Sequence, residues 1–217
     1  MNDPILSIQG LYKTYRREAG EITLFQDFSL TVEKGEFLCI VGPSGCGKTT
    51  LLKLAGGFDP DYEGLILEQN SPIHGPSPHR VMIFQDAGQL FPWMTVLQNI
   101  QFPLLIQKVP RQQATEAARQ ALQATALAGW EDYYPHQLSG GMKQRAALAR
   151  ALAMKPEILM MDEPFSSLDP ETRTSLQDLI KALQQERQIT ILFVTHDREE
   201  AARLATRQIT LTAPRLK

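Results

Sequence analysis

A glycine-rich segment in the first quarter of the chain restricts its fold more than any other feature. Residues 42–49 read Gly-Pro-Ser-Gly-Cys-Gly-Lys-Thr and fit the pattern G-x-x-x-x-G-K-S/T. A continuous apolar run, Phe37–Val41, comes before it, and a helical pattern follows over residues 48–55. Because an uninterrupted apolar run is typical of a strand covered on both faces, the sequence predicts an α/β fold in which a loop joins a buried strand to a helix.

The same loop predicts a phosphate-binding site. Its glycines let the backbone curl so that successive N–H groups point at one anion, and the positive end of the next helix lies there. Lys48 can then reach the β- and γ-phosphates of a nucleotide, and the Thr49 hydroxyl is a candidate Mg²⁺ ligand. A glycine-rich turn that binds nothing is the alternative, and the strand and helix on either side argue against it. The predicted binding residues are Gly42, Pro43, Ser44, Gly45, Cys46, Gly47, Lys48, Thr49 and Thr50.

Two acids follow a second buried strand, residues 158–161. Ligands of open α/β sheets bind at the carboxyl ends of the strands, which is where Asp162 and Glu163 lie. We expect Asp162 to hold Mg²⁺ through its water shell and Glu163 to orient or deprotonate an attacking water. Without the glycine loop upstream, a solvated turn or a helix cap would explain the two acids equally well.

A third motif, Leu-Ser-Gly-Gly-Met-Lys-Gln-Arg over residues 138–145, begins another helix. Ser139 is its natural N-cap, and Gly140 and Gly141 follow. The apolar face of this helix is predicted to hold Met142, Ala146, Ala149 and Ala153. The motif therefore offers a second helix start that can bind an anion, although a flexible start of the helix is the structural alternative.

The remaining segments indicate one domain with an inserted lobe. Period-two patterns in the first third predict half-buried strands, and residues 81–84 and 190–194 predict further buried strands. Residues 70–80, with three prolines, predict a surface loop. Residues 89–154 are rich in Ala, Gln and Leu and predict a helical lobe within the α/β core. Asp169 and Pro170 predict the start of a later helix, whose apolar stripe is Leu176, Leu179, Ile180 and Leu183.

Composition narrows the class of protein. The 217 residues carry 22 Lys and Arg against 24 Asp and Glu, a net charge of −2, which argues against a general nucleic-acid binder. The N-terminal residues have no basic start and no apolar run, so we expect no signal peptide. The longest charge-free stretch, residues 87–107, contains Pro92 and Pro103, which disfavour a lipid-facing helix. We therefore expect a chain that is soluble by itself.

The two cysteines, Cys39 and Cys46, have neither CxxC spacing nor a matching His cluster. We expect no disulfide, no zinc site and a reducing compartment. Cys46 lies near Lys48 and a helix N-terminus, and both favour a thiolate. The sequence therefore predicts that Cys46 is readily alkylated in the nucleotide-free protein, whereas Cys39, on a buried strand, reacts slowly.

These motifs, in this order and over nearly the whole chain, resemble the ATP-binding cassette family of transport ATPases. The resemblance implies that residues 42–49 are the Walker A loop, that Asp162 and Glu163 are Walker B and its catalytic glutamate, and that residues 138–144 are the signature with Met142 in place of Gln. The resemblance further identifies Gln85 as the Q-loop glutamine and His196 as the switch histidine, each of which follows a predicted strand. It identifies Asp169, which precedes a helix, as part of the D-loop, and Tyr15, near the N-terminus, as the residue that would stack on adenine. Tyr12 and Phe25 are the other candidate aromatic residues for adenine.

The family resemblance implies a P-loop NTPase core, residues 1–88 and 155–217, with an antiparallel β subdomain and an inserted helical subdomain, residues 89–154. It implies ATP with Mg²⁺, the metal being held by Thr49, Gln85 and Asp162. Two copies would close around two ATP molecules, each site combining one chain's Lys48 with the other's Ser139. Integral-membrane permease subunits would be direct partners at the cytoplasmic face of the membrane, and a substrate-binding protein would be an indirect partner. No nucleic-acid partner is expected.

Two details resemble the nitrate, sulfonate and taurine importer branch of that family. Residues 90–100, Leu-Phe-Pro-Trp-Met-Thr-Val-Leu-Gln-Asn-Ile, are close to the pattern LLPWxTVxxNV, and Met142 gives Ser-Gly-Gly-Met. Leu90, Phe91 and Trp93 are either the core of the helical lobe or an exposed apolar patch for a partner. A difference from the family is Gly57, where it usually has Leu.

Two other functions remain as alternatives. A soluble cassette ATPase that acts on DNA or ribosomes usually has a long coiled-coil insertion or two cassettes in one chain, and this sequence has neither. A regulatory protein that senses ATP without hydrolysing it would not need both Glu163 and His196.

Overall fold

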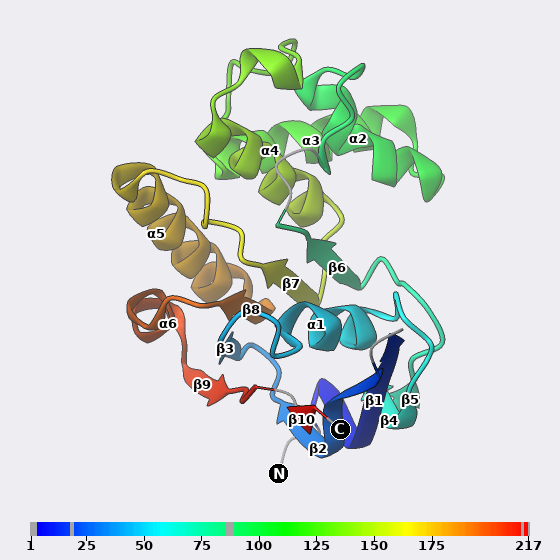
Figure 1. Cartoon of the computed structure of the whole chain (residues 1–217). Helices are drawn as coiled ribbons and strands as arrows, with labels where there is room; N and C mark the ends of the chain where they lie inside the picture. The colour runs from blue at the N-terminus through cyan, green and yellow to red at the C-terminus, as the bar shows by residue number, and fades with distance from the viewer. Residues whose placement is uncertain (1–3, 18–19, 86–88, 214, 217) are drawn as a thin grey trace.

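The computed structural model describes residues 4–17, 20–85, 89–213 and 215–216. Two five-stranded sheets and a helical lobe make up the fold, and the parallel sheet lies between the N-terminal sheet and the lobe (Figure 1). The predicted α/β class, with an antiparallel β part and an inserted helical part, is therefore confirmed.

The first sheet is antiparallel, in the order β10-β2-β1-β4-β5. Its strands are β1 (Leu6–Arg17), β2 (Gly20–Val32), β4 (Glu63–Glu68), β5 (Ser71–Pro72) and β10 (Arg215–Leu216). β1 and β2 form one long pair that runs from Leu6 opposite Val32 to Arg17 opposite Gly20. The sequence did not indicate β4, since Ile66 is its only buried residue, and β5 lies inside the predicted loop of residues 70–80.

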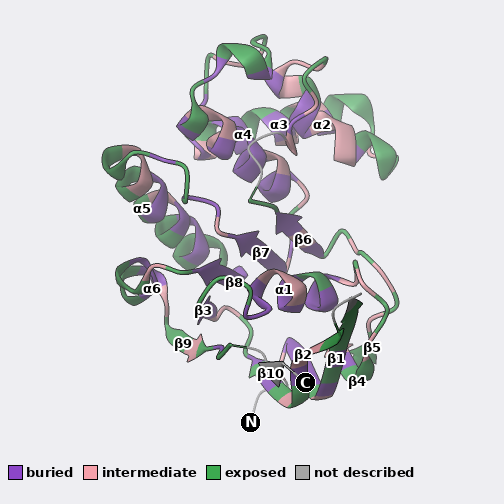
Figure 2. Ribbon diagram, in the orientation of Figure 1, coloured by how far each residue is buried: buried purple, intermediate pink, exposed green. Residues whose placement is uncertain are grey.

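The second sheet is parallel, in the order β6-β7-β8-β3-β9. Its strands are β3 (Phe37–Val41), β6 (Arg80–Ile83), β7 (Ile158–Asp162), β8 (Thr190–Thr195) and β9 (Arg207–Thr210). Every residue of β3, β7 and β8 is buried, as their apolar runs predict (Figure 2). The prediction that a strand covers residues 81–84 was wrong at its end, because β6 stops at Ile83 and Phe84 is 36% exposed.

Helices cover both faces of the parallel sheet, and the alternation of side chains along β3 explains how. Leu38 and Ile40 pack with the helix α1 (Lys48–Gly56) and the N-terminal sheet. Phe37, Cys39 and Val41 pack on the other face with α5 (Pro170–Arg187) and α6 (Arg198–Leu204). α5 begins as predicted, with Asp169 as its N-cap and Pro170 in its first turn. α6, capped by Asp197, was not predicted.

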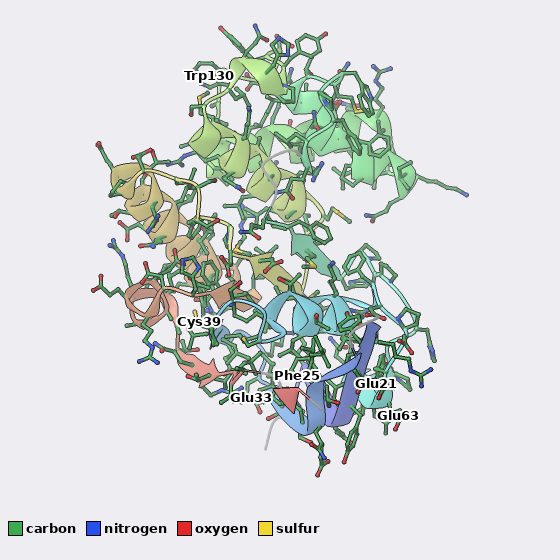
Figure 3. The ribbon with its side chains drawn as sticks, viewed as in Figure 1. Glu21, Phe25, Glu33, Cys39, Glu63 and Trp130 are labelled. Atoms are coloured by element: carbon green, nitrogen blue, oxygen red, sulfur yellow. The ribbon has the colours of Figure 1, made fainter. Side chains whose placement is uncertain are left out.

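The lobe contains α2 (Val96–Ile106), α3 (Arg111–Ala124), a short 3-10 helix (Pro135–Gln137) and α4 (Gly140–Ala153). Its core includes Ala146, Ala149 and Ala153 of α4, so the predicted apolar face of that helix is confirmed. Other α4 residues, Leu148 and Leu152, belong instead to the core of the parallel sheet. α4 thus joins both cores, and the division at residues 89–154 stays a prediction. In Figure 3, Trp130 marks the outer end of the lobe and Cys39 the interior of the core.

Gly57 ends α1 in the left-handed conformation, with a φ of 77°. A Cβ atom added there would lie 2.4 Å from the carbonyl oxygen of Gly75. This close approach of two backbone segments explains why the position that is usually Leu in the resembling family is glycine here. Within the part of the chain that the structure describes, no helix combines the length and the apolar character needed to span a membrane.

Candidate functional site

The glycine loop follows β3 and leads directly into α1, as its sequence predicts. Gly47, the residue before α1, has a φ of 102°, and a Cβ atom there would meet the Phe25 ring at 3.1 Å. Only glycine satisfies both restrictions without strain. The loop therefore presents the first turn of α1, with its unpaired N–H groups, to the edge of the sheet.

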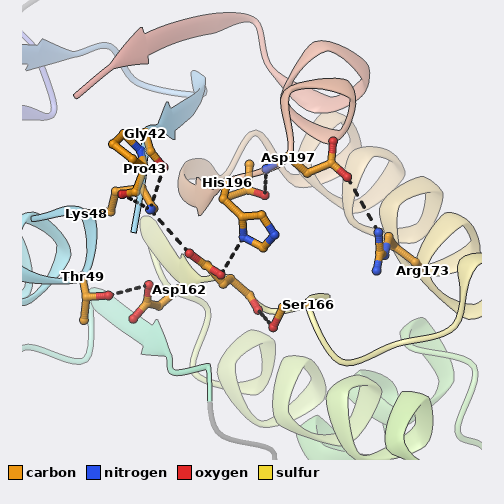
Figure 4. Close-up of polar contacts among 11 residues, drawn as sticks. Gly42, Pro43, Lys48, Thr49, Asp162, Ser166, Arg173, His196 and Asp197 are labelled. Carbon is orange, nitrogen blue, oxygen red and sulfur yellow. Dashed lines mark hydrogen bonds and ion pairs between the residues drawn. The ribbon is translucent and has the colours of Figure 1, made fainter. Parts of the chain in front are cut away.

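Lys48 is held at the centre of this loop although it is only 6% exposed. Its Nζ donates hydrogen bonds to the carbonyl oxygens of Gly42 at 2.9 Å and Pro43 at 3.1 Å (Figure 4). Nζ also lies 3.6 Å from Oε1 of Glu163. The buried ammonium is thus paired with a carboxylate and oriented by backbone, as a buried charge requires.

The two acids at the end of β7 have different surroundings. Asp162 is 4% exposed, and its Oδ1 accepts a hydrogen bond from Thr49 Oγ1 at 3.0 Å. Burial, together with the charge of Glu163, raises the pKa of Asp162 despite the Thr49 hydrogen bond and the nearby lysines. Asp162 and Thr49 therefore place two oxygen atoms side by side, a pair suited to a hard divalent cation.

Glu163 lies between Lys48 and His196. Its Oε2 is 2.9 Å from Nδ1 of His196, and the carboxylate accepts this hydrogen bond from the imidazole (Figure 4). Its φ is 44°, an uncommon value for a glutamate, while its N–H still donates to Val194 O at 3.0 Å. The backbone is therefore held in a strained conformation by β8, and such strain is concentrated at functional positions.

Next to these groups is a cavity of about 480 Å³. Its described lining residues are Tyr15, Ile22, Leu24, Ser44, Gly45, Gly47, Lys48, Thr49, Thr50, Gln85 and Glu163. The cavity has a polar part at the loop and an apolar part at Tyr15 and the neighbouring strand, so it suits a ligand with phosphates at one end and a flat ring at the other. Sequence reasoning missed Ile22 and Leu24, whose signal was their alternate position on the strand that pairs with Tyr15.

Of the three aromatic candidates for the ring, only Tyr15 lines this cavity. Tyr12 lines a separate cavity, and Phe25 is 4% exposed and packs in the core. Gln85, exposed shortly after β6, also lines this cavity, and its predicted role at Mg²⁺ stays a prediction. Gly42, Pro43 and Cys46 do not line it, although the carbonyl oxygens of Gly42 and Pro43 hold Lys48.

The signature motif lies elsewhere. Ser139 caps α4 by accepting a hydrogen bond from Met142 N at 3.3 Å, and neither Ser139, Gly140 nor Gly141 is among the described lining residues of the cavity. Asp169, also absent from that lining, accepts from Thr172 N at 2.9 Å. Hydrogen bonds from Thr172 lower the pKa of Asp169. Ser139, Gly140 and Asp169 are therefore exposed to solvent and lie apart from the chain's own cavity, whereas Gly141 is buried.

The prediction of a reactive Cys46 was wrong. Cys46 is 1% exposed and belongs to the apolar core, and its Sγ would be 2.6 Å from a Cβ atom added to Gly42. The loop turns this side chain inward, so its position near Lys48 gives no access to an alkylating reagent. Cys39 is fully buried, and burial, together with the charge of Glu200, raises the pKa of its thiol to about 12, in agreement with the expected slow reaction.

Comparisons with known proteins agree with this geometry. A family model described as "ABC transporter" matches residues 25–166. The aliphatic sulfonates import ATP-binding protein SsuB of Bacillus licheniformis is 46% identical over 208 residues, which are 96% of this chain and 80% of that protein. The taurine import ATP-binding protein TauB of Shigella boydii is 43% identical over 209 residues, again 96% and 80%.

A solved structure is similar over nearly the whole length of both chains. It is the dimeric structure of a post-hydrolysis state of the ATP-binding cassette MJ0796 bound to ADP and Pi. Its TM-score is 0.83 at 29% sequence identity, and the match covers 97% of this chain and 98% of that one. With a family model over most of the sequence, relatives above 40% identity and a shared fold, the chain belongs to the ABC transporter family.

Proposed function

We propose that this chain hydrolyses Mg-ATP as the nucleotide-binding subunit of an importer. The observation that carries the proposal is the meeting of Lys48, Thr49, Asp162, Glu163 and His196 at one edge of the parallel sheet, within 2.9–3.6 Å of a neighbour in the set. These groups match the parts that phosphoryl transfer needs: a phosphate cradle, oxygen ligands for a metal, and a base beside the water.

The two ends of the cavity match the two ends of ATP. The N–H groups of the loop and the Lys48 ammonium suit the phosphates, and Tyr15, Ile22 and Leu24 suit the base. Thr49, Asp162 and Gln85 are the residues that would hold Mg²⁺, since hydroxyl, carboxylate and amide oxygens are its preferred ligand type. When bound, the ion would neutralise charge on the phosphates.

Glu163 is the candidate general base for the attacking water, and His196 is its positioning partner. A carboxylate that accepts a hydrogen bond from the imidazole and is paired with Lys48 has a fixed orientation toward the cavity. His196 is itself 61% exposed, so its other ring nitrogen is open to a phosphate.

The burial of Asp162 has a consequence for stability that a variant can test. Because its pKa is raised above the ordinary 3.8, the folded protein keeps this proton at a pH where the unfolded chain has lost it. The contribution of Asp162 to the free energy of unfolding is therefore greatest below pH 3.8 and falls as the pH rises through the folded-state pKa.

Asp162→Asn should thus be more stable than the native chain at pH 7 and lose that advantage near pH 4, while Mg²⁺-dependent ATP hydrolysis is lost. Denaturant unfolding at both pH values, without nucleotide, measures the first effect. Asp178→Asn, an exposed acid on α5, is the matched control and should show no such gain at pH 7. A less stable Asp162→Asn at pH 7 would contradict the argument.

A second copy of the chain is the proposed direct partner at the ATP. The signature helix start at Ser139 and the D-loop Asp169 are exposed on each chain, apart from that chain's own cavity. A two-fold dimer would bring each of them to the partner's ATP, since in such an interface any contact between two different residues is made twice, once in each direction. The similar cassette structure is dimeric.

Permease subunits are the proposed partners on another face. A cavity of about 580 Å³ lies between the core and the lobe, and most of its lining is apolar. Its described lining residues include Phe84, Phe91, Phe102 and Ile106, of which Ile106 is 68% exposed. Of the predicted patch, Leu90 is core at 3% exposure, whereas Trp93 is exposed at 70% and is open to contact with a partner. An apolar cavity of this size suits a short helix from a membrane protein.

Replacing Ile106 with Glu should weaken assembly with the permease by about tenfold or more, because a charge in the apolar contact would be buried without a partner. ATP hydrolysis by the isolated chain should not change. Leu65→Glu, an equally drastic change at a 51% exposed residue of β4, is the control and should leave assembly intact. If both variants lost assembly equally, the cavity would not be the contact site for the permease.

Sulfonate- or taurine-type molecules are the proposed cargo, delivered by a substrate-binding protein, with this chain attached to the cytoplasmic face of the membrane through the permease. Relatives with those names at 46% and 43% identity support this choice. The decisive experiment measures ATP hydrolysis with and without Mg²⁺, first by the chain alone and then in vesicles with its permease and loaded binding protein. Stimulation by a loaded binding protein is expected, and a chain without Mg²⁺-dependent hydrolysis in either setting would overturn the proposal.

A further inference from the structure

A buried lysine lies beside the nucleotide cavity without lining it. Lys13, on β1, is 3% exposed. Its Nζ is 3.0 Å from Oδ2 of Asp59 and 3.2 Å from Oδ2 of Asp61, and it also donates to the backbone oxygen of Asp61. Asp59 is the better buried acid, with 21% of its side chain exposed against 90% for Asp61. The Lys13–Asp59 pair is therefore the fixed centre of this cluster.

Tyr15 is attached to that pair. Its hydroxyl donates a hydrogen bond to Oδ2 of Asp59 at 3.3 Å, and the Lys13 Nζ lies 4.8 Å from the centre of its ring. Asp59 comes two residues after Gly57, which ends α1, the helix that begins with Lys48. The Tyr15 ring and the phosphate-binding turn are thus attached to the two ends of one short helix.

The ring forms a wall between two cavities. Tyr15 lines both the nucleotide cavity and a second cavity of about 560 Å³, which is also lined by Lys13, Glu21 and Glu63. Figure 3 places Glu21 and Glu63 at the outer edge of the N-terminal sheet. Lys13 lines the second cavity and is not among the described lining residues of the nucleotide cavity, so Lys13 leaves the part of the ring that lines the nucleotide cavity open to a ligand.

We propose that Lys13 and Asp59 are positioning residues that hold the Tyr15 ring at the cavity and thereby set the affinity for the nucleoside part of ATP, but not for its phosphates. The inference rests on the proposed function. An exposed tyrosine on a strand samples several rotamers, and ordering it on binding costs free energy. A ring already fixed at its hydroxyl and by a cation near its ring avoids that cost.

The surroundings of Lys13 and Asp59 keep both side chains charged. Burial by itself raises the pKa of Asp59, but the hydrogen bond from Lys13 and those from the Asp61 backbone and Tyr15 outweigh it and lower that pKa. Burial likewise lowers the pKa of Lys13, and the hydrogen bonds to Asp59 and Asp61 outweigh it. Both groups are therefore ionised at neutral pH, where ATP binding is measured.

The test compares ATP with inorganic tripolyphosphate, which has no base. Asp59→Asn should raise KM for ATP by about 3- to 10-fold, the range expected for a lost cation–π contact and hydrogen bond, with kcat unchanged. The inhibition constant of tripolyphosphate should stay the same. Lys13→Met should raise KM for ATP in the same way. If Lys13→Met does not fold, Asp59→Asn and Tyr15→Phe still test the proposal, since Tyr15→Phe removes only the hydroxyl. Arg16→Gln is the matched control, since Arg16 is 89% exposed, pairs with Glu21 and does not line the nucleotide cavity.

A double variant shows whether the pair acts through the ring. Asp59→Asn should add nothing to the rise in KM caused by Tyr15→Ala, since the group it positions is already absent. Additive effects, an unchanged KM in Asp59→Asn, or an equal loss of tripolyphosphate affinity would each overturn the inference. Failure of the proposed function looks different, because the native chain would then neither bind nor hydrolyse ATP.

Discussion

Replacing Glu163 with Gln is expected to lower kcat for ATP hydrolysis by about 10²- to 10⁴-fold, the usual contribution of general-base assistance. The amide cannot take a proton from water, yet it has nearly the same shape as the carboxylate. Lys48, Thr49 and Asp162 keep their positions, so ATP binding should persist and an ATP-bound dimer should accumulate. Single-turnover hydrolysis and size-exclusion chromatography with ATP measure the two effects.

The matched control is Glu157→Gln. Glu157 immediately precedes β7, at the end of the strand opposite to Glu163, and lies 3.6 Å from His79 on the surface. Its replacement should leave kcat within about twofold of the native value, as expected for a surface change. Near-normal hydrolysis by Glu163→Gln would exclude Glu163 as the base.

Mixing two inactive variants is expected to restore ATP hydrolysis. Lys48→Ala loses its own hold on the phosphates, and Ser139→Arg blocks the helix start that would act on the partner's ATP. Each homodimer then has two defective sites. In a mixed dimer one site combines both defects, while the other has an intact Lys48 from one chain and an intact Ser139 from the other.

The comparison must be made with each variant alone, at the same total concentration. Activity in the mixture that exceeds the sum of the two is the expected result. If mixed dimers form under ATP and no activity returns, then either the sites are not shared between chains or both must be intact for either to work. A mixture of Lys48→Ala with Asp169→Ala provides a second pair of the same design.

The parts of the site that sequence motifs predict are those set by the backbone. Lys48 follows a loop whose glycines leave few conformations, and Asp162 and His196 follow strands whose carboxyl ends share an edge, so the motifs alone are enough to predict that these residues meet. Side-chain direction was harder to predict. Cys46 has the right neighbours for reactivity, but the turn of the loop buries it.

Contacts between distant residues gave no local signal. Lys13 and Asp59 are 46 positions apart, and nothing in either segment indicates that they pair. β4 contributes one buried residue to the sheet, so its apolar alternation was too weak to predict a strand. Phe84 was expected to continue a buried strand, but its ring packs at 5.8 Å against Phe58 at the rim of the 580 Å³ cavity instead.

Helix α4 has a mechanical consequence, because two faces of its C-terminal half pack in different cores, Ala149 and Ala153 in the lobe and Leu148 and Leu152 against the parallel sheet. Arg150, near its C-terminal end, lines the cavity between core and lobe and donates to Gln89 O at 2.8 Å, while Ser139 at the other end is exposed. A 14-residue helix is about 21 Å long at ~1.5 Å per residue. A tilt of about 10° about its C-terminal end would therefore displace Ser139 by roughly 4 Å, more than the length of a hydrogen bond. In the proposed dimer, such a displacement would be enough to bring Ser139 to the partner's ATP or to withdraw it.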